Sequence, residues 1–138
     1  MKYILILIFL STSLGNSYCQ NTPHCDVGDS EAKFHLGEEI TVCGKLVQLS
    51  KAKYTKGDPI FLNFGGSFPN QSFTAVIWGD VFQKEFSEAL VKYYFAKNLA
   101  IYGMVKEYKG KPTITIKEKS QIEILENYEP AFINITPK

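Results

Sequence analysis

Arginine is absent from this chain of 138 residues, so all fifteen basic side chains are lysines. Arginine binds phosphate and guanine through two parallel hydrogen bonds, which lysine cannot reproduce. Its absence argues against tight, sequence-reading contact with a polyanion. The formal net charge of only +1 points the same way, because proteins that bind nucleic acid tightly usually carry a clear positive excess.

Histidine is also scarce, and the motifs of the common enzyme classes are missing. His24 lies beside Cys25 and Asp26, His35 is isolated, and no CxxC or HxxxH spacing supports a metal site. The chain has no GxSxG elbow, no HExxH motif and no glycine-rich phosphate loop ahead of a helix. We therefore expect a protein that is not an enzyme and that binds neither a cofactor nor a metal.

Long apolar runs are confined to the start of the chain. Lys2 precedes the apolar run of residues 3–10, and small polar residues follow it. This order is typical of a secretory signal peptide, here residues 1–19, with cleavage between residues 15 and 19. We expect a secreted or periplasmic protein with no transmembrane anchor after cleavage.

The chain has three cysteines, and their fate depends on that cleavage. Acylation of Cys19 would make a lipoprotein, but bulky Tyr18 in front of it disfavours this anchoring. If cleavage removes Cys19, the pair Cys25 and Cys43 remains, and a disulfide would join the N-terminal arm to the first strand. Alternatively, Cys43 is a small buried side chain and Cys25 is free. The sequence leaves both possibilities open.

Alternation of apolar and polar residues predicts five β-strands after this arm. They cover residues 40–49, 60–64, 72–78, 99–105 and 113–116, and residues 121–125 extend the last strand past a break. The spacing of the first three favours an antiparallel meander. Gly44, inside the first strand, indicates a bend, a bulge or a close backbone approach.

The hydrophobic period changes between the third and fourth strands. Aromatic and aliphatic side chains recur every four residues there, which predicts one amphipathic helix of three to four turns. The residues are Phe82, Phe86, Leu90 and Tyr94. Asp80, with Gln83 three residues later, resembles a capping box at the start of this helix.

Four segments result: the signal peptide, an N-terminal arm of residues 20–37, a domain of residues 38–125 and a tail of residues 126–138. In the arm, a short helical turn or an extended stretch is expected to pack through Phe34. Three strands, a helix and two strands, with a bent first strand, are the order of the oligonucleotide/oligosaccharide-binding (OB) fold. The predicted fold class is all-β with one helix, a five-stranded Greek-key OB barrel with the helix between strands three and four.

Three stretches also resemble a known family. They are "GEEITVCGKLVQL" (37–49), "PIFLNFGGSFPNQSFTAVIWG" (59–79) and "LAIYGMVKEYKGKPTITI" (99–116). They resemble small OB-fold domains of exported bacterial proteins, which occur alone or appended to secreted nucleases. The resemblance covers roughly residues 30–125, and it implies a domain of nucleic-acid-binding type.

OB barrels bind ligands across strands two and three, between the loops that join strands one to two and four to five. Those two loops concentrate lysine and tyrosine here, whereas acids gather in the arm and near the C-terminal end. A turn requires Gly110 and can use Pro112, but it requires neither the lysines nor Tyr108. The predicted ligand-binding residues are Lys51, Lys53, Tyr54 and Lys56 in the first loop and Lys106, Tyr108, Lys109 and Lys111 in the second.

Lysines beside aromatic side chains predict weak binding of single-stranded DNA or RNA without sequence preference. Outward-facing members of the set Phe61, Phe73 and Trp78 would add stacking surfaces. The alternative is a module of the cell envelope that contacts a protein or a glycan and has no nucleic-acid role. In that case the loop lysines only keep the surface soluble.

Overall fold

The computed structural model describes residues 24–52 and 55–127. The predicted signal peptide therefore lies outside the described residues, as do Lys53, Tyr54 and the tail beyond residue 127. No helix of the described part is long and apolar enough to cross a membrane.

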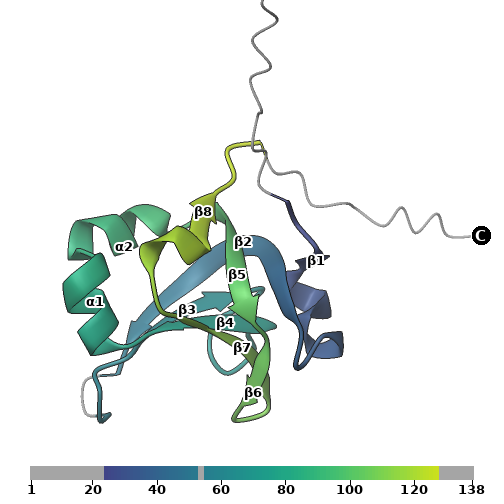
Figure 1. Cartoon of the computed structure of the whole chain (residues 1–138), viewed down its shortest axis with the longest axis horizontal. Helices are drawn as coiled ribbons and strands as arrows, with labels where there is room; N and C mark the ends of the chain where they lie inside the picture. Colours follow the sequence, from purple (N-terminus) through teal and green to yellow (C-terminus); the bar gives the residue numbers. More distant parts are fainter. Residues whose placement is uncertain (1–23, 53–54, 128–138) are drawn as a thin grey trace, which may run out of the picture.

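An eight-stranded sheet forms the body of the molecule (Figure 1). Its path runs β6-β7-β4-β3-β2-β5-β8, and β1 pairs with β2 outside this path. The strands are β1 (Val27–Gly28), β2 (Glu39–Lys51), β3 (Ile60–Phe64), β4 (Phe73–Ile77), β5 (Asn98–Met104), β6 (Lys106–Tyr108), β7 (Lys111–Ile116) and β8 (Ile122–Ile124). The predicted antiparallel meander of β2, β3 and β4 is confirmed, and β4 pairs with β7 in parallel.

Strand β2 is long because it pairs with two different strands along its length. Its first half, from Glu39 to Lys45, pairs with β5, and its second half, from Leu46 to Lys51, pairs with β3. The register shifts between Leu46 and Gln48, so the strand carries a bulge where it changes partners. This change of partner curves the sheet.

The core lies beneath one face of this curved sheet. Alternate side chains of β3 and β4 fill it, as the sequence pattern predicts. They include Ile60, Leu62, Phe64, Phe73, Ala75 and Ile77, all buried. The other face of the same two strands therefore carries the residues that are out of phase with the core.

The segment between β4 and β5 contains two short helices, so the prediction of one continuous helix is wrong. They are α1 (Gly79–Glu85) and α2 (Glu88–Tyr94), at one side of the sheet in Figure 1. The backbone is extended at Phe86 and Ser87, and the Ser87 hydroxyl caps α2 by accepting a hydrogen bond from the Leu90 N–H at 3.2 Å. The hydrophobic period continues across this break, which hides it from a periodicity argument.

The predicted capping box is also wrong. Trp78 is the N-cap of α1, and it makes no side-chain cap bond. Asp80 lies inside the first turn, where its carboxylate accepts a hydrogen bond from the Val81 N–H at 2.8 Å. An acidic residue there still favours the helix, because it lies near the positive end of the helix dipole.

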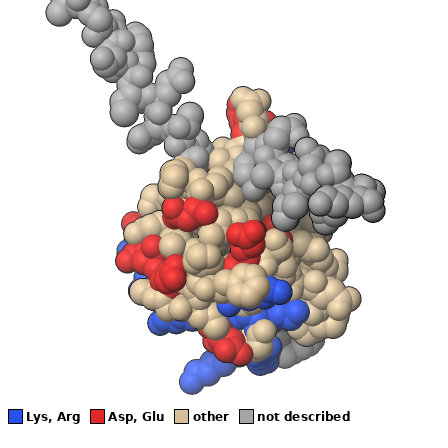
Figure 2. Space-filling model, turned by 90° about the vertical axis from the view of Figure 1, so that its right-hand side faces the viewer, with Lys and Arg blue, Asp and Glu red and all other residues tan. Residues whose placement is uncertain are grey.

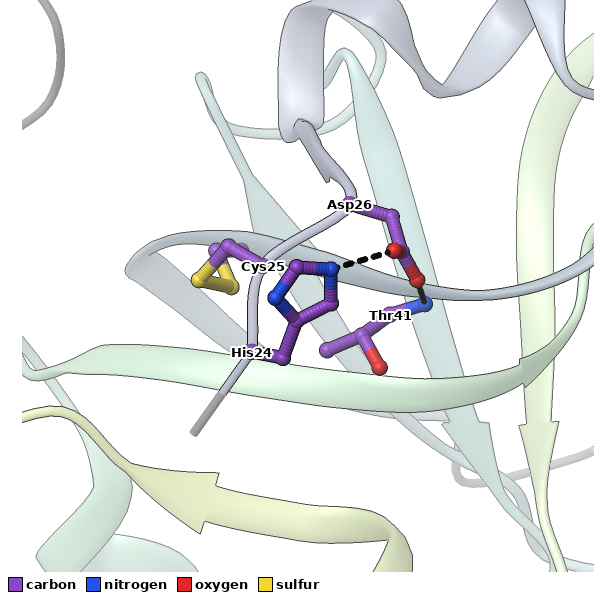
Figure 3. A network of polar contacts seen from close by, with 5 residues as sticks. His24, Cys25, Asp26 and Thr41 are labelled. Carbon is purple, nitrogen blue, oxygen red and sulfur yellow. Dashed lines mark hydrogen bonds and ion pairs between the residues drawn. A yellow bond between two sulfur atoms is a disulfide. The ribbon is translucent and has the colours of Figure 1, made fainter. Parts of the chain in front are cut away.

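The N-terminal arm is fastened to β2 by covalent and polar contacts (Figure 3). Cys25 and Cys43 are joined by a disulfide, as in the first of the two alternatives. Asp26 accepts a hydrogen bond from the Thr41 N–H at 2.8 Å, and its other carboxylate oxygen lies 3.0 Å from Nε2 of His24. Beyond these contacts, β1 pairs in parallel with β2.

A 3₁₀ helix, η1 (Asp29–Phe34), follows β1. The expectation that Phe34 packs on the body is wrong, since its side chain is 73% exposed. Ala32 is the residue of η1 that is fully buried in the core. A small side chain fits there because the helix lies close against the sheet.

Two further predictions fail near the C-terminal end. Residues 121–125 do not extend the last predicted strand, because β8 pairs with β5 after the short 3₁₀ helix η2 (Lys119–Gln121). Residues 106–108, predicted as part of a turn, form strand β6 and pair with β7. Only Val105 separates β5 from β6.

Candidate ligand-binding groove

The β6–β7 hairpin has a turn of two residues, Lys109 and Gly110. Tyr108 and Lys111 pair on either side of it, and the two turn residues have φ values of +48° and +77°. Positive φ at both positions is typical of a type I′ turn, for which Asn-Gly is the preferred sequence. The turn thus explains Gly110, but it offers no reason for a lysine at 109. Pro112 lies in β7 opposite Glu107, outside the turn.

A pocket of about 450 Å³ lies over the outer face of β3, β4 and β7. Its floor contains Asn63, Thr74 and Thr113, which are polar but only 2%, 5% and 6% exposed. Phe61, half-buried, lines the pocket beside them. These residues are out of phase with the core residues of their strands, which is why their side chains reach this face.

The loop between β3 and β4 forms one wall of the pocket. Phe68, Pro69 and Gln71 line it from this loop, with Phe68 70% exposed and Gln71 only 6% exposed. Backbone hydrogen bonds hold the loop: the Asn70 N–H donates to the Ser67 carbonyl at 2.7 Å. The loop therefore presents an aromatic ring at the rim and an amide near the floor.

Side-chain hydrogen bonds connect this wall to the floor. Oε1 of Gln48 accepts from Nδ2 of Asn63 and from the Phe68 N–H, each at 2.8 Å. Oδ1 of Asn63 in turn accepts from the Thr74 hydroxyl at 3.0 Å. Among the described residues, Oε1 of Gln71 is a buried oxygen with no hydrogen-bond partner. Such groups are rare in proteins and call for an explanation.

The predicted residues of the β6–β7 hairpin all reach this region. Tyr108, Lys109 and Lys111 line the same pocket as the residues of the β3–β4 loop. Lys106 lines a second hollow of about 140 Å³, which shares Phe61, Tyr108 and Thr113 with the first. Because they share walls, we treat the two as one groove, which continues from Gln71 past Tyr108.

The predicted residues of the first loop are placed less completely. Lys51 and Lys56 are exposed and line neither hollow, and Lys53 and Tyr54 lie outside the described residues. Thr55, the neighbour of that pair, does line the 450 Å³ pocket together with the hairpin residues. The two loops therefore meet at the same pocket.

The three aromatic candidates on the strands differ in orientation. Phe61 lines both hollows, and half-buried Trp78 lines the second. Phe73 belongs to the core, where its ring lies 5.3 Å from that of Phe64. Two of the three are therefore available to a ligand in the groove.

Charge is unevenly distributed around the groove. The described lining of the larger hollow includes two lysines and no acid, and the smaller one adds Lys106 and Glu107. Figure 2 shows acids gathered in the upper and middle part of one face, with lysines lower, at the height where Figure 1 places the β6–β7 hairpin. Acidic groups also appear among those lower lysines.

A third hollow, between β5 and η2, has a different character. Glu39 and Glu118 line it together with Lys106 and Lys117, so it offers no excess of one charge. A hydrogen bond with Glu39 raises the pKa of the Tyr102 hydroxyl, because the phenol is stabilised in its protonated form. In the described part of the chain, no group of three or more His, Cys, Asp or Glu residues is placed to hold a metal ion.

Sequence reasoning missed the polar residues of the groove. Asn63 and Thr74 carried a signal, because each interrupts an apolar strand on the face opposite the core. Gln48 and Gln71 carried none, since polar residues in strands and loops are ordinary, and Phe68 carried none because it lies in a loop outside any periodic pattern. Their convergence depends on the bulge of β2 and on the path of the β3–β4 loop.

Comparison with known proteins gives no family. No family model matches the chain, and no curated protein matches its sequence. The predicted resemblance to exported bacterial domains therefore stays a prediction.

Solved structures with a similar arrangement include OB domains. One is an OBody, AM1L10, bound to hen egg-white lysozyme (18% identity, TM-score 0.48, covering 75% of this chain and 95% of that one). Another is the OB domain of MM0293 from Methanosarcina mazei (15% identity, TM-score 0.45, covering 67% of this chain and 76% of that one). A third is asparaginyl-tRNA synthetase from Pyrococcus horikoshii (16% identity, TM-score 0.44, covering 67% of this chain and 20% of that one).

Proposed function

We propose that this chain is an exported, non-enzymatic OB-fold module that binds single-stranded nucleic acid weakly along the groove. Strands β2, β3, β4 and β7, with β5 and β6 as two halves of one strand, would form the five-stranded barrel. In support, β5 pairs with β2 and β6 pairs with β7, although only Val105 lies between them. The two helices lie between the third and fourth barrel strands, where the OB fold has its helix.

One observation carries the functional part of the proposal. Tyr108, Lys109 and Lys111 line one pocket together with exposed Phe68 and half-buried Phe61, and no acid lines that pocket among the described residues. Lysines attract the phosphates, and the aromatic rings provide stacking surfaces for the bases. Without arginine, and with few phosphate contacts, binding is expected to be weak.

The test is a titration of the chain with a labelled single strand of about 16 nucleotides, the upper site size of an OB fold. We expect a Kd tighter than about 100 μM at about 50 mM salt, and a steep loss of affinity as salt rises. Lys109→Asn removes a rim charge while it supplies the residue that a type I′ turn prefers. This variant should keep its stability, bind more weakly and have a salt slope shallower by about 0.7.

Lys84→Asn is the matched control, because Lys84 is an exposed lysine of α1 and lines none of the hollows described above. It removes the same charge, so an equal effect of both variants would mean that only net charge matters. Absence of any binding at low salt would refute the nucleic-acid proposal. Binding of a glycan or a protein that persists at high salt and in Lys109→Asn would support the alternative.

A further inference from the structure

We propose that the 450 Å³ pocket reads one nucleotide of the bound strand, and that it selects a base carrying an amino group, such as adenine or cytosine. This inference deepens the proposed function at the same groove. It concerns Gln71, Thr74 and Thr113, which the lysine argument does not use.

The buried oxygen of Gln71 is the first observation. Oε1 of Gln71 makes no hydrogen bond in the described part of the chain. The residue lies in the wall of the pocket and is 6% exposed. A buried acceptor without a donor costs free energy, so a ligand that brings an N–H or O–H to it gains affinity. A phosphate oxygen cannot do this, because it is itself an acceptor.

The two threonines on the floor of the pocket also present oxygens that can accept a hydrogen bond from a ligand. The Thr74 hydroxyl donates to Oδ1 of Asn63, and the Thr113 hydroxyl donates to the Lys111 carbonyl at 3.2 Å. A hydroxyl has a single proton, so each of these oxygens can only accept a further hydrogen bond. The pocket therefore offers three buried acceptors, from Gln71, Thr74 and Thr113.

The positive charge at the rim of the pocket disfavours a cationic ligand as the source of these hydrogen-bond donors. Lys109 and Lys111 line the same pocket, and the described lining includes no carboxylate to offset them. An amine or a metal ion would be repelled there. A neutral ring with an amino group, attached to an anionic backbone, satisfies both the acceptors inside and the lysines outside.

The aromatic lining favours a flat ring. Phe68 of the β3–β4 loop and Tyr108 of the β6–β7 hairpin both line the pocket and are both exposed, and Phe61 lies beside the floor. Aromatic side chains of this kind stack on bases. Uracil and thymine have one ring N–H and no amino group, so they bring fewer donors to these acceptors than adenine or cytosine do. The selection applies to one nucleotide and adds to the sequence-independent affinity of the strand.

Free nucleosides test the pocket alone, because they lack phosphate. NMR titration should place adenosine at the amides of Phe68 and Gln71, with an affinity about tenfold above that of N6,N6-dimethyladenosine, whose amino group carries no proton. Uridine should also bind more weakly than adenosine. Gln71→Leu should remove this preference, whereas Gln83→Leu, at an exposed position of α1, should leave it unchanged.

The outcomes separate the two proposals. Equal affinity for adenosine and its dimethyl analogue, or an unchanged preference in Gln71→Leu, overturns the inference even if oligonucleotides bind. Nucleoside binding with the expected preference, but no salt-dependent oligonucleotide binding, supports the pocket and refutes the proposed function. Gln71-dependent binding of a neutral oligosaccharide, with no shift caused by nucleosides, overturns the inference in favour of a glycan. The comparison of ligands remains decisive if the Gln71 variant does not fold.

Discussion

At the residue scale, Gly44 has a clear physical role. A Cβ atom at this position would lie 2.7 Å from Oδ1 of Asp29 and 3.0 Å from its Cβ, so the side chain of η1 occupies the space beside the glycine. Asp29 also accepts a hydrogen bond from the Ser72 hydroxyl, at the end of the β3–β4 loop. The carboxylate thus links η1 to the loop that carries Gln71.

We predict that Gly44→Ala destabilises the chain by about 1–3 kcal/mol, because the added methyl group displaces Asp29. In the Asp29→Gly background, which removes both the carboxylate and its Cβ atom, the same substitution should instead be neutral or stabilising by up to about 1 kcal/mol, since alanine is favoured over glycine in a strand. Urea unfolding of the four variants measures this coupling. Gly28→Ala is the control, because a Cβ atom there would meet nothing within 4 Å. A destabilisation that persists without Asp29 would contradict the steric explanation.

At the element scale, β2 organises the fold because it pairs with β5, β3 and β1. The arm joins this strand through the disulfide, through β1 and through the contact of Asp26 with Thr41. Cys43 packs with Ala100 and Leu125, on a small cluster separate from the main core. Fixing the arm here also positions Asp29.

Loss of the disulfide should lower the free energy of unfolding by about 3 kcal/mol, because the bond closes a loop with a sequence separation of 18. Urea unfolding of Cys25→Ser/Cys43→Ala, with and without a reductant, measures the effect. The reductant should destabilise the original chain and leave the double variant unchanged. Equal stability of the oxidised and reduced chains would show that β1 and η1 hold the arm without the bond.

At the scale of the whole molecule, the groove combines parts that are distant in sequence. Ser50 comes from β2, Gln71 from the β3–β4 loop, and Tyr108 from the β6–β7 hairpin. The second hollow continues past Tyr108 to Trp78, just ahead of α1. A nucleic-acid strand that fills the whole groove would therefore contact four segments of the chain: β2, the β3–β4 loop, the β6–β7 hairpin and the residue ahead of α1.

Trp78 is the only tryptophan, and it therefore reports on this continuation without a label. We expect an oligonucleotide that fills both hollows to change the emission of Trp78, with the same midpoint as the labelled titration. Lys109→Asn should shift both curves equally, because it weakens one common binding event. Unchanged emission while a labelled strand binds would show that the ligand does not pass the second hollow.

The sequence by itself determined the strand alternation, the strand order of the meander and the hairpin glycine. These depend on local rules: alternation sets which face is buried, and a positive φ favours glycine at position 110. The same alternation placed Phe61 and Asn63 opposite the core. It could not detect the break at Phe86 and Ser87, because the apolar period continues through it.

Only the tertiary structure decided which polar groups come together. Gln48 and Asn63 are ordinary residues in the sequence, and they bond to each other and to the Phe68 N–H because β2 bulges and the β3–β4 loop folds back over the sheet. Gln71 of the same loop lines the pocket together with Asn63. The hydrogen-bond partners of a side chain depend on contacts between distant segments, which no local pattern encodes. For that reason the lysines of the hairpin were visible from the sequence, whereas the unpartnered oxygen of Gln71 was not.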